Sequence, residues 1–275
     1  MEAIGEGAAV LRSGVTLPYA ETGGPGGIPV VLVHAYAESW RYFESVLDLL
    51  PPSIHAFVPT QRGHATVEGD VRSFRVGDFA ADIVDFMDAV GIARAVIVGS
   101  SSSGLVAQTV ATSHPERVAG LVLISSPVSL ADNPGVAVMR EEIMALSEPI
   151  DPRFVEQFVL GTSPEGMSQE LVARLVAESL AIPAQVWREA LQGLLEADLP
   201  VALESIQVPT LLLSGGEDAF VHDDQQVLLD RIPDAELVVY DGVGHGPHLA
   251  QPDLVASDLV AFVNEHRERP AHRTS

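Results

Sequence analysis

Short runs of apolar residues, separated by longer stretches with helical spacing, constrain the fold of this chain most strongly. The runs lie at residues 30–33, 54–58, 95–98, 121–124, 211–213 and 237–240. Each run is apolar at consecutive positions rather than at every second one, which is typical of strands buried on both faces of a parallel sheet. The stretch at 79–90 has apolar residues with the spacing of one helix face. The alternation predicts an α/β fold with a doubly wound, mostly parallel sheet.

The alternation stops between about residues 127 and 200, where no strand-like run occurs. This segment contains helix-like pieces at 136–146, 152–160, 169–180 and 183–195, and prolines separate them. We therefore predict a helical cap over residues 127–200, inserted into an α/β core formed by residues 1–126 and 201–269. The polar segment 270–275 is predicted to be a flexible tail.

The charge balance and the missing cysteines argue against several classes of function. There are 15 basic and 38 acidic residues, which gives a formal net charge of -23. An acidic surface repels nucleic acid and anionic membranes, so neither partner is expected. The chain has no cysteine, which excludes disulfides and thiolate chemistry. Its 9 histidines lack metal-ligand spacing, and we expect no metal and no other cofactor.

Neither the N-terminus nor a later segment has the features of a targeting or membrane sequence. The first ten residues lack the basic and apolar regions of a secretory signal peptide. No uncharged apolar run reaches the roughly 18 residues of a membrane span. We expect a cytoplasmic protein, and the sequence leaves its oligomeric state open. The glycine-rich segment 23–27 lacks the Lys-Ser/Thr of a phosphate loop and is predicted to be a hairpin turn.

A serine-rich turn follows the run at 95–98. Gly99 ends this predicted strand, four serines follow, and Gly104 precedes a helix. A sharp strand-to-helix turn exposes a nucleophile at a helix N-terminus, and it requires small neighbours because the backbone is crowded. Reading the pattern Gly-x-Ser from Gly99 gives Ser101 as the nucleophile. We favour this choice because Gly99, a glycine suited to the crowded turn, then ends the strand directly. Counting back from Gly104 gives Ser102, and a turn that only caps the helix is the structural alternative.

Two later turns carry a candidate base and a candidate acid. His245 lies in a glycine-rich turn after the last strand-like run, from which it could take the serine proton. Asp218 follows the run at 211–213 and could orient the imidazole. The alternatives are His248 for the base, and Glu217, Asp223 or Asp224 for the acid.

The turn His34-Ala35-Tyr36, after the run at 30–33, is expected to complete a site for acyl transfer. Acyl transfer needs N–H donors that stabilise the developing oxyanion. The predicted donors are the backbone N–H groups of Tyr36 and of Ser102, the residue after the favoured nucleophile. His34 is expected to brace this loop through hydrogen bonds.

Five segments together resemble the α/β-hydrolase superfamily over nearly the whole chain outside the cap. They are the turns at 34–36 and 62–65, the serine turn at 99–104, the acid turn at 215–218, and Gly244-His245 with Pro252. Alanines at 35 and 65 replace family glycines, and Ser103 replaces the second glycine of Gly-x-Ser-x-Gly. The resemblance implies a serine hydrolase with catalytic Ser101, Asp218 and His245, in the chain order of that family.

The predicted reaction is hydrolysis of a small carboxylic ester or lactone with a hydrophobic body, through an acyl-enzyme. The predicted substrate contacts are Ala35, Met139, Phe158 and Trp187. The last three belong to the predicted cap, where such side chains either line a pocket or pack the cap's own core. Because one fold hosts many chemistries, two other hypotheses stand. The first is carbon–carbon bond hydrolysis or cofactor-free perhydrolysis by the same residues, and the second is a ligand-sensing receptor with slow turnover.

Overall fold

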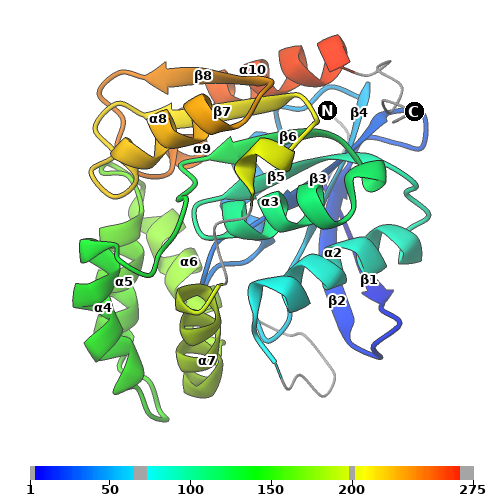
Figure 1. Cartoon of the computed structure of the whole chain (residues 1–275). Helices are drawn as coiled ribbons and strands as arrows, with labels where there is room; N and C mark the ends of the chain where they lie inside the picture. Colours follow the sequence, from blue (N-terminus) through cyan, green and yellow to red (C-terminus); the bar gives the residue numbers. More distant parts are fainter. Residues whose placement is uncertain (1–3, 65–72, 198–201, 267–275) are drawn as a thin grey trace.

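The computed structural model describes residues 4–64, 73–197 and 202–266 of the chain (Figure 1). Within these residues, eight strands form one sheet in the order β1-β2-β4-β3-β5-β6-β7-β8. The strands are β1 (Gly5–Val10), β2 (Thr16–Thr22), β3 (Ile28–Val33), β4 (Ile54–Pro59), β5 (Ala95–Ser100), β6 (Val118–Ile124), β7 (Thr210–Gly215) and β8 (Ala235–Tyr240). β2 pairs antiparallel with β1 and β4, and the other pairs are parallel. The predicted α/β fold is confirmed.

Strands β1 and β2 were not predicted. Their side chains do not form apolar runs, because β1 alternates between exposed and less exposed positions, and half-buried positions separate the buried ones in β2. Such alternation is typical of an antiparallel edge that faces water on one side. The prediction relied on continuous apolar runs, and it therefore found the inner strands and missed this edge of the sheet.

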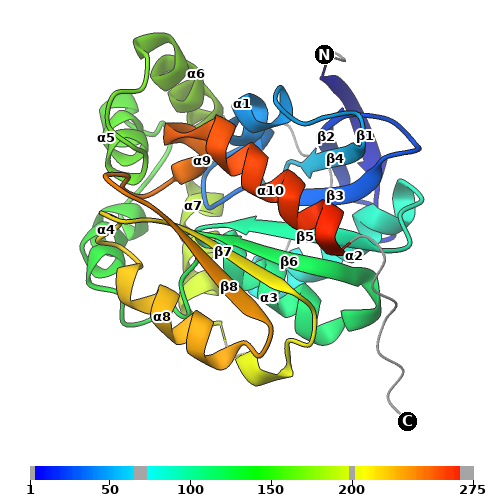
Figure 2. The same ribbon diagram turned by 90° about the horizontal axis from the view of Figure 1, so that it is seen from above.

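Helices cover both faces of the sheet (Figures 1 and 2). Successive side chains of β5 point to opposite faces: Val96 and Val98 pack in the core that contains Leu259, and Ile97 packs in the core that contains Leu105. Both faces of β5 are buried, which explains its consecutive apolar residues. The helices outside the segment between β6 and β7 are α1 (Glu44–Leu47), α2 (Val76–Ala89), α3 (Ser103–Ser113), α8 (His222–Arg231), α9 (Pro247–Ala250) and α10 (Pro252–His266). Short 3₁₀ helices are η1 (Trp40–Phe43), η2 (Pro115–Arg117) and η3 (Leu203–Ser205).

In the described part of the chain, four helices lie between β6 and β7 and gather beside one end of the sheet (Figure 1). They are α4 (Pro134–Met144), α5 (Pro152–Thr162), α6 (Gln169–Leu180) and α7 (Ala184–Leu195). Three of them begin at a side chain that accepts backbone N–H groups, namely Asn133, Asp151 and Ser168. The predicted helical pieces are therefore present. Their division from the rest of the chain as a separate cap domain stays a prediction.

The hairpin predicted at residues 23–27 is wrong. This loop connects β2 to β3, and β4 lies between these two strands in the sheet. The loop crosses the start of β4 so closely that a Cβ on Gly23 would lie 2.0 Å from the carbonyl oxygen of Ile54. The glycines therefore serve a close crossing of backbones rather than a turn between paired strands.

Some predictions fall on residues outside the described ranges. These are the tail at 270–275, the boundary at residues 200 and 201, and the alanine at 65. Among the residues that the structure describes, no helix combines the length and apolar character needed to cross a membrane.

Candidate active site

The serine-rich turn between β5 and α3 is tight. Ser101 has a φ of 49°, in the left-handed region that non-glycine residues rarely occupy. A Cβ on Gly99 would lie 2.5 Å from the carbonyl oxygen of Ser103, and one on Gly104 would lie 1.8 Å from the Ser126 hydroxyl. The strained conformation of Ser101 thus depends on glycine at both flanks, as expected for a turn that exposes one side chain.

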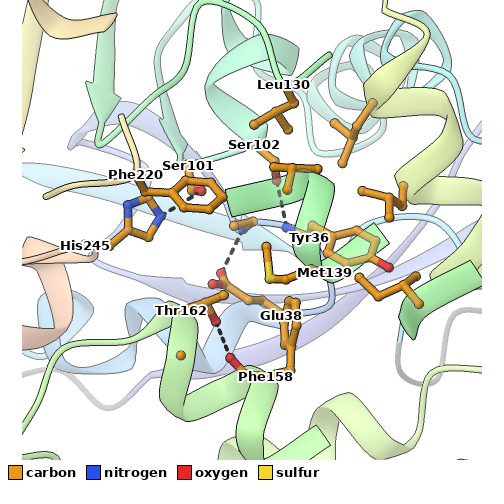
Figure 3. Close-up of a pocket in the computed structure, with 16 residues that line it drawn as sticks. Tyr36, Glu38, Ser101, Ser102, Leu130, Met139, Phe158, Thr162, Phe220 and His245 are labelled. Atoms are coloured by element: carbon orange, nitrogen blue, oxygen red, sulfur yellow. Dashed lines mark hydrogen bonds between the residues drawn. The ribbon is translucent and has the colours of Figure 1, made fainter. Parts of the chain in front are cut away.

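The Ser101 hydroxyl begins a chain of hydrogen bonds. His245 Nε2 lies 2.9 Å from Ser101 Oγ (Figure 3), and His245 Nδ1 lies 2.9 Å from Asp218 Oδ2. Asp218 follows β7, and His245 lies in the turn between β8 and α9. Because parallel strands end at the same edge, three segments far apart in sequence meet there.

The ionisation of Asp218 determines which ring nitrogen of His245 carries a proton. Burial of the carboxyl group opposes its ionisation. The hydrogen bond and charge of His245, with the hydrogen bond from the Phe220 N–H, outweigh this effect and lower the pKa of Asp218. An ionised carboxylate only accepts hydrogen bonds, so Nδ1 of His245 carries the proton that it donates. Nε2 of the neutral ring is then the acceptor for the Ser101 hydroxyl proton.

The alternative acids and the alternative serine do not make the hydrogen bonds to His245 that Asp218 and Ser101 make. Glu217 is exposed, Asp223 and Asp224 lie on α8, and the carboxylate that contacts His245 is that of Asp218. Ser102 Oγ accepts the Tyr36 N–H at 2.9 Å. Of the residues singled out in the sequence, the structure therefore brings together Ser101, Asp218 and His245.

His248, the alternative base, is buried away from this chain of hydrogen bonds. Its ring stacks on Phe43 with 4.9 Å between centroids, and within the described residues neither ring nitrogen has a hydrogen-bond partner. Burial, with a smaller effect of the nearby His245, lowers the pKa of His248 to about 3. The His248 ring is therefore a packing element, and it does not take the place of the base.

The neutral state of His248 predicts a pH dependence of stability. The unfolded chain takes up a proton on this histidine below about pH 6.5, whereas the folded chain does so only below about pH 3. Its contribution to stability is therefore complete above pH 6.5 and falls by about 1.4 kcal/mol per pH unit as the pH decreases through this window. Urea unfolding of the His248→Leu variant should give a shallower loss between pH 7 and 5 than the wild type. Substitution of exposed His222 is the matched control, and parallel pH profiles for wild type and His248→Leu would contradict the prediction.

The loop after β3 approaches the serine turn from the other side. His34 braces this loop as expected: its Nδ1 lies 2.9 Å from Ala35 O, and its Nε2 accepts the Gln61 N–H at 3.0 Å. Burial lowers the pKa of His34 to about 3, so the ring is neutral and can accept that bond. The bracing holds Tyr36 against the serine turn, with its N–H directed at Ser102 Oγ.

An apolar pocket opens beside Ser101 and His245 (Figure 3). The predicted contacts Ala35, Met139 and Phe158 line it. Trp187 does not line it, and this prediction was wrong. The indole has no exposed surface and packs edge-on against Tyr36 and Phe158, with centroids 5.5 and 4.9 Å away. Trp187 therefore supports the pocket wall from behind.

Several pocket residues were missed by the sequence analysis. Most of them are apolar side chains of the helical segment and of nearby loops, namely Leu130, Val136, Ile143, Leu191, Leu194 and Phe220. Their positions on helix faces could not be distinguished from ordinary core positions in the sequence. Glu38 is different, because an acid four residues after His34 in the predicted oxyanion loop was a visible signal.

Glu38 places a carboxyl group in this apolar pocket. Its Oε2 accepts the Ala35 N–H at 2.8 Å (Figure 3). Burial raises the pKa of Glu38 to about 8, although the hydrogen bond from Ala35 partly opposes this shift. The pocket therefore contains a carboxyl group that is mostly neutral near pH 7 and gains a negative charge as the pH rises through 8.

The described residues contain no group of three or more histidine, cysteine, aspartate or glutamate side chains arranged to hold a metal ion. The polar atoms beside Ser101 instead fit an organic ligand with a polar group near the serine and an apolar body. Such a combination of apolar walls and a few convergent polar groups is typical of small-molecule sites.

Comparisons with known proteins agree with this fold. The pimeloyl-[acyl-carrier protein] methyl ester esterase of Pectobacterium atrosepticum is 30% identical over 255 residues, covering 89% of this chain and 97% of the relative. The non-heme chloroperoxidase of Streptomyces lividans is 26% identical, covering 94% and 99%. The crystal structure of the enol-lactonase from Burkholderia xenovorans LB400 superposes with a TM-score of 0.83 at 20% identity, covering 94% and 100%. The model of the alpha/beta hydrolase family matches residues 30–258, and the chain therefore belongs to that family.

Proposed function

We propose that this protein hydrolyses carboxylic esters or lactones with Ser101 as the nucleophile. The observation that carries the proposal is the continuous hydrogen-bonded chain from Ser101 through His245 to buried Asp218, at the mouth of an apolar pocket. Hydrogen-bonded nucleophile, base and orienting acid are the parts that acyl transfer requires. A position in an accessible pocket favours a functional role over a purely structural one.

In the proposed mechanism, His245 Nε2 takes the Ser101 proton while Ser101 Oγ attacks the ester carbonyl. Asp218 holds the imidazole in the required tautomer and stabilises the imidazolium that forms. The tetrahedral oxyanion collapses, the alcohol leaves with the proton from His245, and an acyl-enzyme remains. Water then loses a proton to His245 and attacks the acyl carbonyl. The bond between the acyl carbon and Ser101 Oγ breaks, His245 returns the proton to Oγ, and the acid is released. With a lactone the two product groups stay joined in one ring-opened molecule.

The pocket walls and the similar proteins both support an ester with a largely apolar body. Ala35, Met139 and Phe158 provide apolar walls next to the nucleophile. The relatives named above include a methyl ester esterase, and a structural neighbour is an enol-lactonase. We propose for this chain the chemistry that these names share, attack on an ester carbonyl.

A second candidate is perhydrolysis by the same residues, in which hydrogen peroxide replaces water as the attacker of the acyl-enzyme and a peracid is released. The similarity to a non-heme chloroperoxidase over 94% of the chain favours this candidate. Both reactions share the acyl-enzyme, so the choice depends on which small nucleophile reaches the acyl carbonyl.

A panel of short-chain p-nitrophenyl esters and simple lactones, with and without hydrogen peroxide, tests these proposals. We expect ester or lactone turnover in water by the purified protein. Peracid formation faster than acid formation at millimolar peroxide would favour the second candidate. Absence of turnover across the panel, combined with thermal stabilisation by an ester analogue, would favour a ligand-sensing role instead.

Glu38 predicts a selectivity that depends on pH. Its ionised carboxylate should repel an acyl chain that ends in a carboxylate, whereas the neutral form should not. We therefore expect the ratio of kcat/KM for dimethyl adipate over monomethyl adipate to increase several-fold between pH 7 and pH 9, since the pKa of Glu38 lies at about 8.

The control for this prediction is Glu38→Gln, which keeps an oxygen acceptor for the Ala35 N–H but carries no charge. In this variant the ratio should not change between pH 7 and pH 9. If the wild type and the Gln variant give the same pH dependence, Glu38 does not control the charge selectivity of the pocket.

A further inference from the structure

The Ser102 hydroxyl lies between the serine turn and the loop that carries Tyr36 (Figure 3). It accepts the Tyr36 N–H at 2.9 Å. This N–H is one of the two donors predicted for the oxyanion. In the structure it is therefore engaged by a side chain of the protein, and that side chain belongs to the residue that follows the nucleophile.

The proton of the Ser102 hydroxyl is available for another acceptor. Ser102 precedes α3, yet its side chain makes no capping hydrogen bond to the helix. In the described part of the chain, this hydroxyl makes one hydrogen bond, in which it accepts the Tyr36 N–H. A serine before a helix ordinarily caps it with its side chain, and the Ser102 side chain does not do so.

Ser102 also lies where the proposed reaction would take place. Ser102 is buried within the protein, and it lines the same pocket as Ser101, Tyr36 and His245. A hydroxyl can accept one hydrogen bond and donate another at the same time. Accepting the Tyr36 N–H polarises the Ser102 O–H and strengthens it as a donor.

We propose that the Ser102 hydroxyl is itself an oxyanion donor, a catalytic role of its side chain in addition to that of its backbone N–H. The inference rests on the proposed function, because it requires attack of Ser101 on a carbonyl. As the Ser101 Oγ–carbon bond forms, the carbonyl π electrons move to oxygen and the Ser101 proton moves to His245. The Ser102 O–H then donates a hydrogen bond to the oxyanion and keeps its proton throughout.

In this arrangement the Tyr36 N–H acts on the oxyanion through the Ser102 hydroxyl rather than by direct donation. Donors aimed at charge that develops only in the transition state raise kcat, whereas uniform binding of the substrate alters KM. The proposal therefore predicts a specific kinetic pattern. The opposite possibility is that the hydroxyl competes with the oxyanion for the Tyr36 N–H, and its removal would then increase the rate.

The test compares Ser102→Thr with Ser102→Val, a pair with the same shape that differs by the hydroxyl, together with Ser102→Ala. The measurements are kcat and KM with a p-nitrophenyl ester, and the inhibition constant of an alkyl trifluoromethyl ketone, which forms a tetrahedral adduct with an active serine. We expect Ala and Val to lower kcat about 100-fold at nearly constant KM, the size of effect that follows loss of one oxyanion donor. The ketone should bind to the Ala and Val variants more weakly by a similar factor. The Thr variant should retain most of the wild-type kcat and most of the affinity for the ketone.

Each other outcome overturns the inference. An Ala variant as fast as the wild type, or faster, would show that the hydroxyl is a bystander or a competitor for the Tyr36 N–H. A Thr variant that loses as much as Val would show that shape, rather than the hydroxyl, matters. Thermal unfolding of all three variants identifies any that do not fold, and the Thr–Val comparison cancels a shared packing defect. Failure here would leave the proposed function intact, because separate measurements test that proposal, namely turnover of the ester panel and the activity of the Ser101→Ala variant.

Discussion

Replacing Ser101 with alanine is expected to lower ester turnover by about 10⁴- to 10⁶-fold, the range that follows removal of the nucleophile in serine hydrolases. The fold should tolerate the change, because alanine removes one oxygen atom and leaves Gly99 and Gly104 on either side of the turn. His245 would lose the hydroxyl that lies 2.9 Å from its Nε2, and no oxygen nucleophile would remain at that position. Initial rates with a p-nitrophenyl ester, corrected for spontaneous hydrolysis, measure the effect.

The neighbouring hydroxyl of Ser103 provides a control at the same turn. It donates to the carbonyl oxygen of His34 and accepts a hydrogen bond from Gln61 Nε2, whereas the hydroxyl next to His245 Nε2 is that of Ser101. Ser103→Ala should therefore retain most of the activity, with a small loss of stability from the two broken hydrogen bonds. Equal activity of the wild type and the Ser101→Ala variant would exclude Ser101 as the nucleophile and would reopen the Ser102 register.

The second large effect concerns the acid. Asp218→Asn should lower kcat by about 10⁴-fold, as expected when an amide favours the wrong tautomer of the base. The Asp218 side chain has no exposed surface and lies 2.9 Å from His245 Nδ1. An asparagine there can present its NH₂ group to Nδ1, which would place the ring proton on Nε2 and block acceptance of the serine proton. The measurement is kcat at saturating ester for both proteins.

Glu217 supplies the matched control for this prediction, since it precedes Asp218 and its side chain is exposed. Glu217→Gln makes the same carboxylate-to-amide change one residue away and should alter kcat less than twofold. A large loss in Glu217→Gln together with a small loss in Asp218→Asn would reverse the assignment of the acid.

The inner strands of the sheet could be predicted from sequence, because a strand buried on both faces has apolar or small residues at consecutive positions. Strands β5 and β7 are buried at every residue, and their sequences are correspondingly apolar or small. The turns that follow these strands were also visible, because strained or crowded backbone requires glycine and serine at fixed positions. Gly99 and Gly104 are examples, since a Cβ at either would collide with neighbouring atoms.

Features that depend on contacts between distant segments could not be predicted. The bond from the Tyr36 N–H to Ser102 Oγ joins residues 66 positions apart, and its presence depends on strand register and loop bracing. Trp187 was assigned to the pocket because large aromatic side chains are common in such sites. Its actual place behind Tyr36 follows from the packing of α7, which has no signature in a single sequence. The burial of His248 likewise depends on packing that the sequence does not show.

Ser101 is proposed as the nucleophile, and labelling with a fluorophosphonate tests this claim on the protein itself. The protein would be incubated with the probe, digested, and the modified residue identified by tandem mass spectrometry. The structure and the proposed mechanism predict one label, on Ser101, and its loss in the Asp218→Asn variant under the same brief exposure. A label on Ser102, or an unlabelled protein that still hydrolyses esters, would contradict the claim.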